Sequence, residues 1–145
     1  MKLAGSAEVA GSPEQIFDKL LEPAVLTRCI PGCESMEETA PAVYDTVVKA
    51  GVGAVKGSFR GQVTVSDVAR PHSYRLSIEG KSTVGFVRGG ANIRLEPTTT
   101  GARIHYDGEA KISGLLASVG ARLLDASAKG VAQKFFEALA REVSP

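Results

Sequence analysis

The chain has only two cysteines, and both lie in the stretch CIPGC at 29–33. Two cysteines cannot build the disulfide framework that holds small secreted domains together. The sequence also has no apolar run of about 18 residues, so we expect no membrane-spanning helix. The N-terminal residues lack the apolar core of a signal peptide. These absences predict a soluble protein of the cytoplasm.

An excess of charge of either sign is missing as well. The chain carries 17 Lys and Arg residues and 16 Asp and Glu residues, for a net charge of +1. With no cluster of basic residues, this argues against a protein that binds nucleic acid by bulk electrostatic attraction. The 145 residues, 43% of them hydrophobic, are enough for a hydrophobic core and predict one domain spanning 1–145.

Alternating apolar residues predict a strand over 2–10 and a long series of strands between about residues 35 and 113. Turn sequences such as RPHS at 70–73 and TTTG at 98–101 separate these strands. Strands joined by short turns are typical of an antiparallel meander. Each strand has one apolar and one polar face, so we expect the sheet to be covered on one side only.

Helices are expected at two places. After the first strand, Ser12 can cap a short helix that has Pro13 at its first position, and a second short helix runs from Pro23 toward Pro31. From about residue 115 to 143, a broad apolar stripe predicts an amphipathic helix of roughly seven or eight turns. The fold class is therefore α+β, with a curved antiparallel sheet wrapped around a long C-terminal helix.

Many of the 16 glycines fall inside predicted strands. They indicate strong curvature of the sheet and close approach of the helix, or an internal apolar cavity for a lipophilic molecule, and the two interpretations are compatible. The residues expected to line such a cavity are Phe59, Val63, Ile78, Gly80, Ile104, Tyr106, Gly108, Leu116 and Leu123.

The expected interior has few side chains that could take part in catalysis. Only Tyr106 among the expected inward residues has a polar group, while Glu79 and His105 fall on the outward phase of their strands. No pair of acids converges as general acid–base catalysis would need, and no serine lies in a G-x-S-x-G elbow. GVGAVKG at 51–57 precedes a strand and not a helix, so it predicts a hairpin loop and not a nucleotide site. We expect a protein that is not an enzyme and has no catalytic residues.

The CIPGC stretch has four interpretations: a metal site, a redox pair, a disulfide and a turn. Zinc needs about four ligands, and the two histidines lie far along the chain. A redox pair is usually C-x-x-C at the start of a helix, and a local disulfide is rare in the cytoplasm. We expect a turn that ends a helix, with two half-buried thiols and no metal.

Five stretches together resemble one family over almost the whole chain. They are EPAVLTRCIPGCESMEE, VGAVKGSFRGQVTVSDV, SYRLSIEGK, GFVRGGANIRLEP and SVGARLLDASAKGVAQKFFEAL. The family that they resemble is the CoxG family of carbon monoxide dehydrogenase subunits, which belongs to the START-like (SRPBCC) helix-grip superfamily.

This resemblance implies a non-catalytic accessory protein of a molybdenum-containing carbon monoxide dehydrogenase or related hydroxylase. It implies a link to the cytoplasmic membrane and the quinone pool, with no resident cofactor and a quinone or other lipophile as ligand. The alternatives are a START-like enzyme of the cyclase or hydratase type and an adaptor with no ligand. The residues implied at the rim of the cavity are Cys29, Pro31, Cys33, Val55 and Lys56.

Two features depart from the family pattern. The family loop usually reads G-P-V-K-G, and here Ala54 replaces the proline, which loosens the loop but keeps Lys56. Many members also continue past the long helix into a hydrophobic tail, whereas this sequence ends at Pro145. We expect a cytoplasmic protein with peripheral contact at the inner face of the cytoplasmic membrane.

Overall fold

The computed structural model describes residues 1–143 of the chain. The helices and strands follow the predicted order, with a short 3-10 helix (η1) before the last α-helix. The elements are β1 (Lys2–Ala10), α1 (Pro13–Leu20), α2 (Pro23–Cys29), β2 (Cys33–Ala40), β3 (Val43–Val52), β4 (Val55–Ala69), β5 (Ser73–Ser82), β6 (Gly85–Pro97), β7 (Gly101–Ser113), η1 (Leu115–Val119) and α3 (Ala121–Val143).

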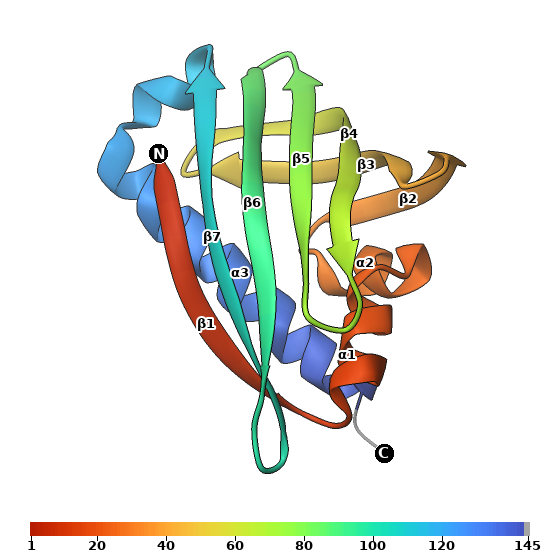
Figure 1. The fold of residues 1–145 in the computed structure, drawn as a ribbon. Coiled ribbons are helices and arrows are strands. Elements are labelled where there is room, and N and C mark those ends of the chain that lie inside the picture. The colour runs from red at the N-terminus through yellow and green to blue at the C-terminus, as the bar shows by residue number, and fades with distance from the viewer. Residues whose placement is uncertain (144–145) are drawn as a thin grey trace.

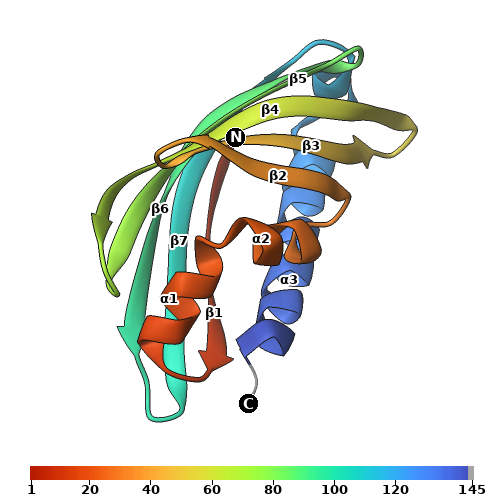
Figure 2. The same ribbon diagram turned by 90° about the vertical axis from the view of Figure 1, so that its right-hand side faces the viewer.

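All seven strands form one antiparallel sheet in the order β1-β7-β6-β5-β4-β3-β2. The sheet arches over the three α-helices, which lie together on its concave side (Figures 1 and 2). Strands β2 to β7 follow one another as a meander, and β1 closes the far edge by pairing with β7. This arrangement confirms the predicted α+β fold, with a curved sheet around a long C-terminal helix.

The first helix begins where the sequence predicts. The Ser12 side chain accepts a hydrogen bond from the backbone N–H of Gln15 at 3.0 Å, and Pro13 occupies the first turn. This cap satisfies one of the N–H groups that have no partner within the helix. The helix then buries Ile16, Phe17 and Leu20 under the sheet.

The C-terminal helix is shorter than predicted. The expected single helix from residue 115 is divided into η1 and α3 by Gly120, which has a φ of +94°. Gly114, at the start of η1, has a φ of +79°. Because L-residues with side chains rarely adopt such angles, these two glycines set the boundaries of η1, and the apolar stripe alone could not reveal them.

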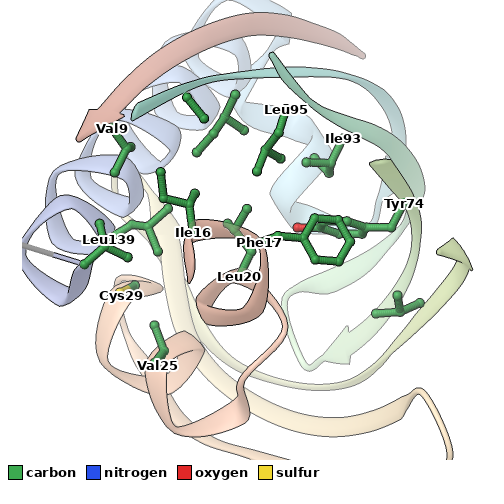
Figure 3. Close-up of a cluster of buried hydrophobic side chains, with 14 of the residues drawn as sticks. Val9, Ile16, Phe17, Leu20, Val25, Cys29, Tyr74, Ile93, Leu95 and Leu139 are labelled. Atoms are coloured by element: carbon green, nitrogen blue, oxygen red, sulfur yellow. The ribbon is translucent and has the colours of Figure 1, made fainter. Parts of the chain in front are cut away.

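The core is concentrated at one end of the molecule. Helices α1 and α2 and the C-terminal half of α3 bring Ile16, Phe17, Val25 and Leu139 together against the sheet (Figure 3). At the other end η1 contacts strands β3, β4, β6 and β7, whereas α3 contacts mainly β1 and, less extensively, β3. The sheet is therefore tightly covered at the α1–α2 end and less so beneath η1, and this difference positions the candidate site.

Candidate ligand-binding cavity

An open apolar pocket of about 420 Å³ lies between the sheet, η1 and α3. It opens beside the N-terminal half of α3, where Val131 is 46% exposed. We call it the outer pocket, and its lining residues include Pro31, Val48, Val52, Phe59, Gly61, Ile78, Gly80, Val87, Leu116 and Val131.

A second, more enclosed cavity of about 150 Å³ lies toward α1 and α2. We call it the inner chamber. Ile78 lines both cavities, so the inner chamber adjoins the outer pocket at that residue. The lining residues of the inner chamber are Leu20, Leu21, Leu26, Ile30, Met36, Tyr44, Val63, Val65, Tyr74, Leu76, Ile78, Ile93, Ile104, Phe135 and Phe136.

Two glycines paired across β4 and β5 help to keep the outer pocket open. Gly61 lies opposite Gly80 in the register of the two strands. A β-carbon on Gly80 would meet only Phe59, at 3.9 Å, so it would project into free space. A β-carbon on Gly61 would instead collide with the backbone oxygen of Glu79. Gly61 therefore permits close strand pairing, while Gly80 contributes volume to the pocket.

Most of the residues expected to line a cavity do lie at one of the two. Phe59, Gly80 and Leu116 lie at the outer pocket, Val63 and Ile104 at the inner chamber, and Ile78 at both. These residues therefore lie on the face of β4, β5 and β7 that is turned toward the helices.

Three expected lining residues lie elsewhere. Tyr106 stacks on the Phe136 ring with a centroid distance of 5.5 Å and is outside both cavities. Gly108 approaches β6, where an added β-carbon would be 2.6 Å from the backbone oxygen of Gly90. Leu123 is 52% exposed. Its predicted inward position is wrong because the break at Gly120 places η1, and not the first turn of α3, over this end of the sheet.

The expected rim residues are divided in the same way. Pro31 lines the outer pocket, but Cys29 is buried in the core, and Cys33 is half-buried at the start of β2. Lys56 lines a shallow hollow at the β3–β4 hairpin, and Val55 pairs with Val52 in that hairpin. Both cysteines are free thiols, and the stretch between them is the turn from α2 to β2.

Two tyrosines of the inner chamber were not singled out from the sequence. Tyr74 is 5% exposed, and its ring meets Phe17 edge to face with centroids 5.5 Å apart. Burial raises the pKa of the Tyr74 hydroxyl above its ordinary value. The pKa of Tyr44 is also raised, mainly by burial and further by the Glu38 carboxylate. The alternation of Tyr74 with Leu76 and Ile78 could have revealed its inward direction.

Charged side chains lie outside the inner chamber. His105 and Glu96 contact each other at 3.2 Å, and their side chains are 31% and 52% exposed. Between residues 1 and 143, no group of three or more His, Cys, Asp or Glu side chains could hold a metal ion. The inner chamber is thus suited to holding an apolar molecule, with tyrosine hydroxyl groups as its polar contacts, whereas Lys49 and Glu79 also line the outer pocket.

Comparisons with known proteins agree with this fold. The model of the CoxG family of carbon monoxide dehydrogenase subunits matches residues 5–144. A conserved protein from Geobacillus kaustophilus is 31% identical, with a TM-score of 0.94, and the alignment covers 99% of this chain and 95% of that one. No curated protein matches the chain.

More distant solved structures share the fold alone. A START superfamily protein from Mycobacterium smegmatis is 14% identical, with a TM-score of 0.74 over 98% of this chain and 96% of that one. The di-domain ARO/CYC protein BexL of the BE-7585A biosynthetic pathway is 8% identical, with a TM-score of 0.69 over 100% of this chain and 50% of that one. Among the helices of residues 1–143, none is long and apolar enough to cross a membrane.

Proposed function

Because the chain belongs to the CoxG family of carbon monoxide dehydrogenase subunits, we propose that it is a non-catalytic accessory protein of a molybdenum-containing carbon monoxide dehydrogenase or related hydroxylase. In this role it binds a hydrophobic molecule, of which a quinone is the leading candidate, in the outer pocket and inner chamber. It thereby links the enzyme to the quinone pool of the cytoplasmic membrane.

The observation that carries the proposal is the pair of adjoining apolar cavities under α3 and η1. Moving apolar surface of a ligand from water into such a site contributes about 25 cal/mol per Å². The inner chamber is lined by aliphatic and aromatic side chains and by no acid, histidine, lysine or arginine. This lining supports carriage of a ligand over acid–base chemistry performed on it.

The surroundings of the outer pocket support brief contact with a membrane or a partner. Val131 lies at the pocket and is 46% exposed, while Leu115 and Leu123, in η1 and at the start of α3, are 58% and 52% exposed. An exposed apolar side chain at the pocket, such as Val131, would let a lipophile pass between two apolar phases with little exposure to water. In this proposal the protein is cytoplasmic and makes peripheral contact with the inner face of the membrane.

The test is quinone uptake by protein that has been stripped of lipid by organic solvent and refolded. Decylubiquinone serves as the probe, and native mass spectrometry measures the bound fraction. We expect a one-to-one complex with the wild-type protein. Gly80→Leu should reduce the complex strongly, because its side chain would fill the outer pocket without striking the backbone.

Ser77→Leu is the matched control, since it adds the same side chain at an exposed position of the same strand. It should bind decylubiquinone as the wild type does. Absence of uptake by folded wild-type protein, together with no lipophile in the solvent extract, would contradict ligand carriage. Equal uptake by the wild type and Gly80→Leu would show that the quinone binds elsewhere.

A further inference from the structure

The inner chamber contains a polar group that the protein itself leaves unused. Tyr74 extends from β5 into the middle of the buried cluster, with its hydroxyl oxygen at the inner end (Figure 3). Its side chain lines the inner chamber and is 5% exposed. A hydroxyl group in such an apolar site loses its hydrogen bonds to bulk water and gains stability only if it finds another partner.

The Tyr74 hydroxyl makes no hydrogen bond to another side chain or to the backbone within residues 1–143, and burial alone accounts for its raised pKa. Within residues 1–143, every side-chain oxygen or nitrogen that has no accessible surface of its own has a hydrogen-bond partner. The Tyr74 hydroxyl must therefore adjoin open space. Tyr74 borders both the inner chamber and a hollow on the outer face of the sheet, but its ring points into the buried cluster, so its hydroxyl faces the inner chamber (Figure 3).

The shape and lining of the inner chamber indicate which ligand group would reach this hydroxyl. An apolar cavity of about 150 Å³ is large enough to bind an aromatic ring such as benzene, and the inner chamber has about this volume. Phe135, Phe136 and Tyr44 offer aromatic surfaces for a planar ring. Since a protonated tyrosine donates its O–H, the complementary group on the ring is a hydrogen-bond acceptor.

We propose that the inner chamber is the subsite for a carbonyl-bearing ring and that the Tyr74 hydroxyl donates a hydrogen bond to the carbonyl oxygen. This inference rests on the proposed function and specifies how the ligand is oriented. The ring lies deep, toward α1 and α2, and an attached apolar chain extends past Ile78 into the outer pocket. Tyr74 acts as a specificity-determining residue that favours quinones over hydrocarbons of the same size.

The test compares two probes of nearly equal shape, 2-methyl-1,4-naphthoquinone and 2-methylnaphthalene, of which only the first has carbonyl groups. Titration calorimetry measures their affinities for the wild type and for Tyr74→Phe. We expect Tyr74→Phe to weaken quinone binding by between about twofold and tenfold, the effect of one hydrogen bond. Binding of the hydrocarbon should not change, because the ring of residue 74 remains.

Infrared spectroscopy of the bound quinone gives a second measurement. A carbonyl that accepts a hydrogen bond absorbs at lower frequency, so the band should shift upward in Tyr74→Phe. Tyr106→Phe is the matched control, because it removes the same hydroxyl group from a tyrosine that lies outside both cavities. That variant should leave both the quinone preference and the carbonyl band unchanged. Thermal unfolding checks that each variant is folded.

The outcomes separate this inference from the proposed function. If the wild type binds the quinone and Tyr74→Phe binds it equally well, ligand carriage stands and the role of Tyr74 is wrong. Equal weakening of both probes would assign Tyr74 to packing and would also overturn the inference. If the folded wild type binds neither this quinone nor decylubiquinone, the proposed function itself fails.

Discussion

Cys29 and Cys33 lie four residues apart but have different surroundings. Cys29 is 3% exposed in the core between α2 and α3. Cys33 is half-buried, with its sulfur 3.4 Å from the backbone oxygen of Ser35 and 3.7 Å from the Thr46 hydroxyl oxygen. Burial, followed by the Glu142 carboxylate, raises the pKa of the Cys29 thiol above its ordinary value. The thiolate is the reactive form of cysteine. The Cys29 sulfur is therefore protected from reagents both by its burial and by its protonation.

We predict that a disulfide reagent such as Ellman's reagent labels Cys33 in the folded protein and Cys29 only after unfolding. The raised pKa also predicts a pH dependence. The Cys29 contribution to stability is fully present below the pKa of the unfolded thiol and is lost as the pH rises toward the folded pKa. Denaturant unfolding between pH 7 and 10 should therefore show a steeper alkaline loss in wild type than in Cys29→Ala. Labelling of both thiols at one rate in the folded state would contradict this.

At the scale of single residues, the alternation of the sequence predicts which face of a strand a side chain lies on, but not which groups it contacts. Tyr74 has the same phase along β5 as Ile78, so its inward side chain could be predicted. The sequence could not predict that the Tyr74 hydroxyl lacks a hydrogen-bond partner, because α1 places the apolar Phe17 side chain beside the Tyr74 ring. For the same reason Gly80 could be predicted to face inward, whereas the free space next to it depends on the helices that cover the strand.

At the scale of elements, the break between η1 and α3 can be tested with a pair of glycines. Gly120 has a φ of +94°, and Gly130 lies within α3 with no atom within 4 Å of an added β-carbon. Gly120→Ala should therefore destabilise the protein by about 1–2 kcal/mol through backbone strain. Gly130→Ala should stabilise it by about 1 kcal/mol, because alanine favours the helix over glycine.

Guanidinium unfolding of the two variants and the wild type measures both changes in the free energy of unfolding. Each variant is the control for the other, since both add one methyl group to open space near the same helix. Stabilisation by Gly120→Ala would show that the helix runs unbroken from η1 into α3, as the apolar stripe of the sequence suggests. Destabilisation by Gly130→Ala would instead contradict only the predicted gain in helix propensity within α3.

The strands were predicted more accurately than the last helix, for a physical reason. Alternation with a period of two depends on the burial of every second residue, and it ends at turns that the sequence marks, such as 98–101. The apolar stripe of the helix continues through Gly120, because Leu116 and Leu124 suit both a 3-10 turn and an α-helix. A positive φ leaves no trace in that pattern, so the helix was predicted six residues too long.

At the scale of the whole molecule, the order of elements and the antiparallel sheet could be predicted, and the division of the interior could not. The adjoining outer pocket and inner chamber depend on the pairing of Gly61 with Gly80 and on η1 closing one end of the sheet. Both features join segments distant in sequence. Gly108, which the sequence predicted to line the cavity, approaches the β6 backbone instead. Substitution there would strain the sheet and leave the cavity open.

Gly80→Leu therefore separates a ligand carrier from an adaptor that only docks. The substitution would alter the interior and leave the outer surface of the sheet and helices as it is. We predict that the variant still co-purifies with the molybdenum-containing dehydrogenase to the wild-type extent. Electron transfer from the dehydrogenase to quinone in vesicles should fall at least tenfold compared with wild type, because the carrier can no longer take up the quinone.

Ser77→Leu again serves as the control and should support both docking and electron transfer. Loss of docking in Gly80→Leu alone would mean that ligand uptake shapes the docking surface, and adding decylubiquinone to the wild type should then strengthen docking. Full electron transfer with Gly80→Leu would contradict carriage and leave the adaptor role. Docking depends on the surface of the protein, and electron transfer to quinone also depends on its interior. A variant that docks normally but does not support electron transfer is therefore still folded.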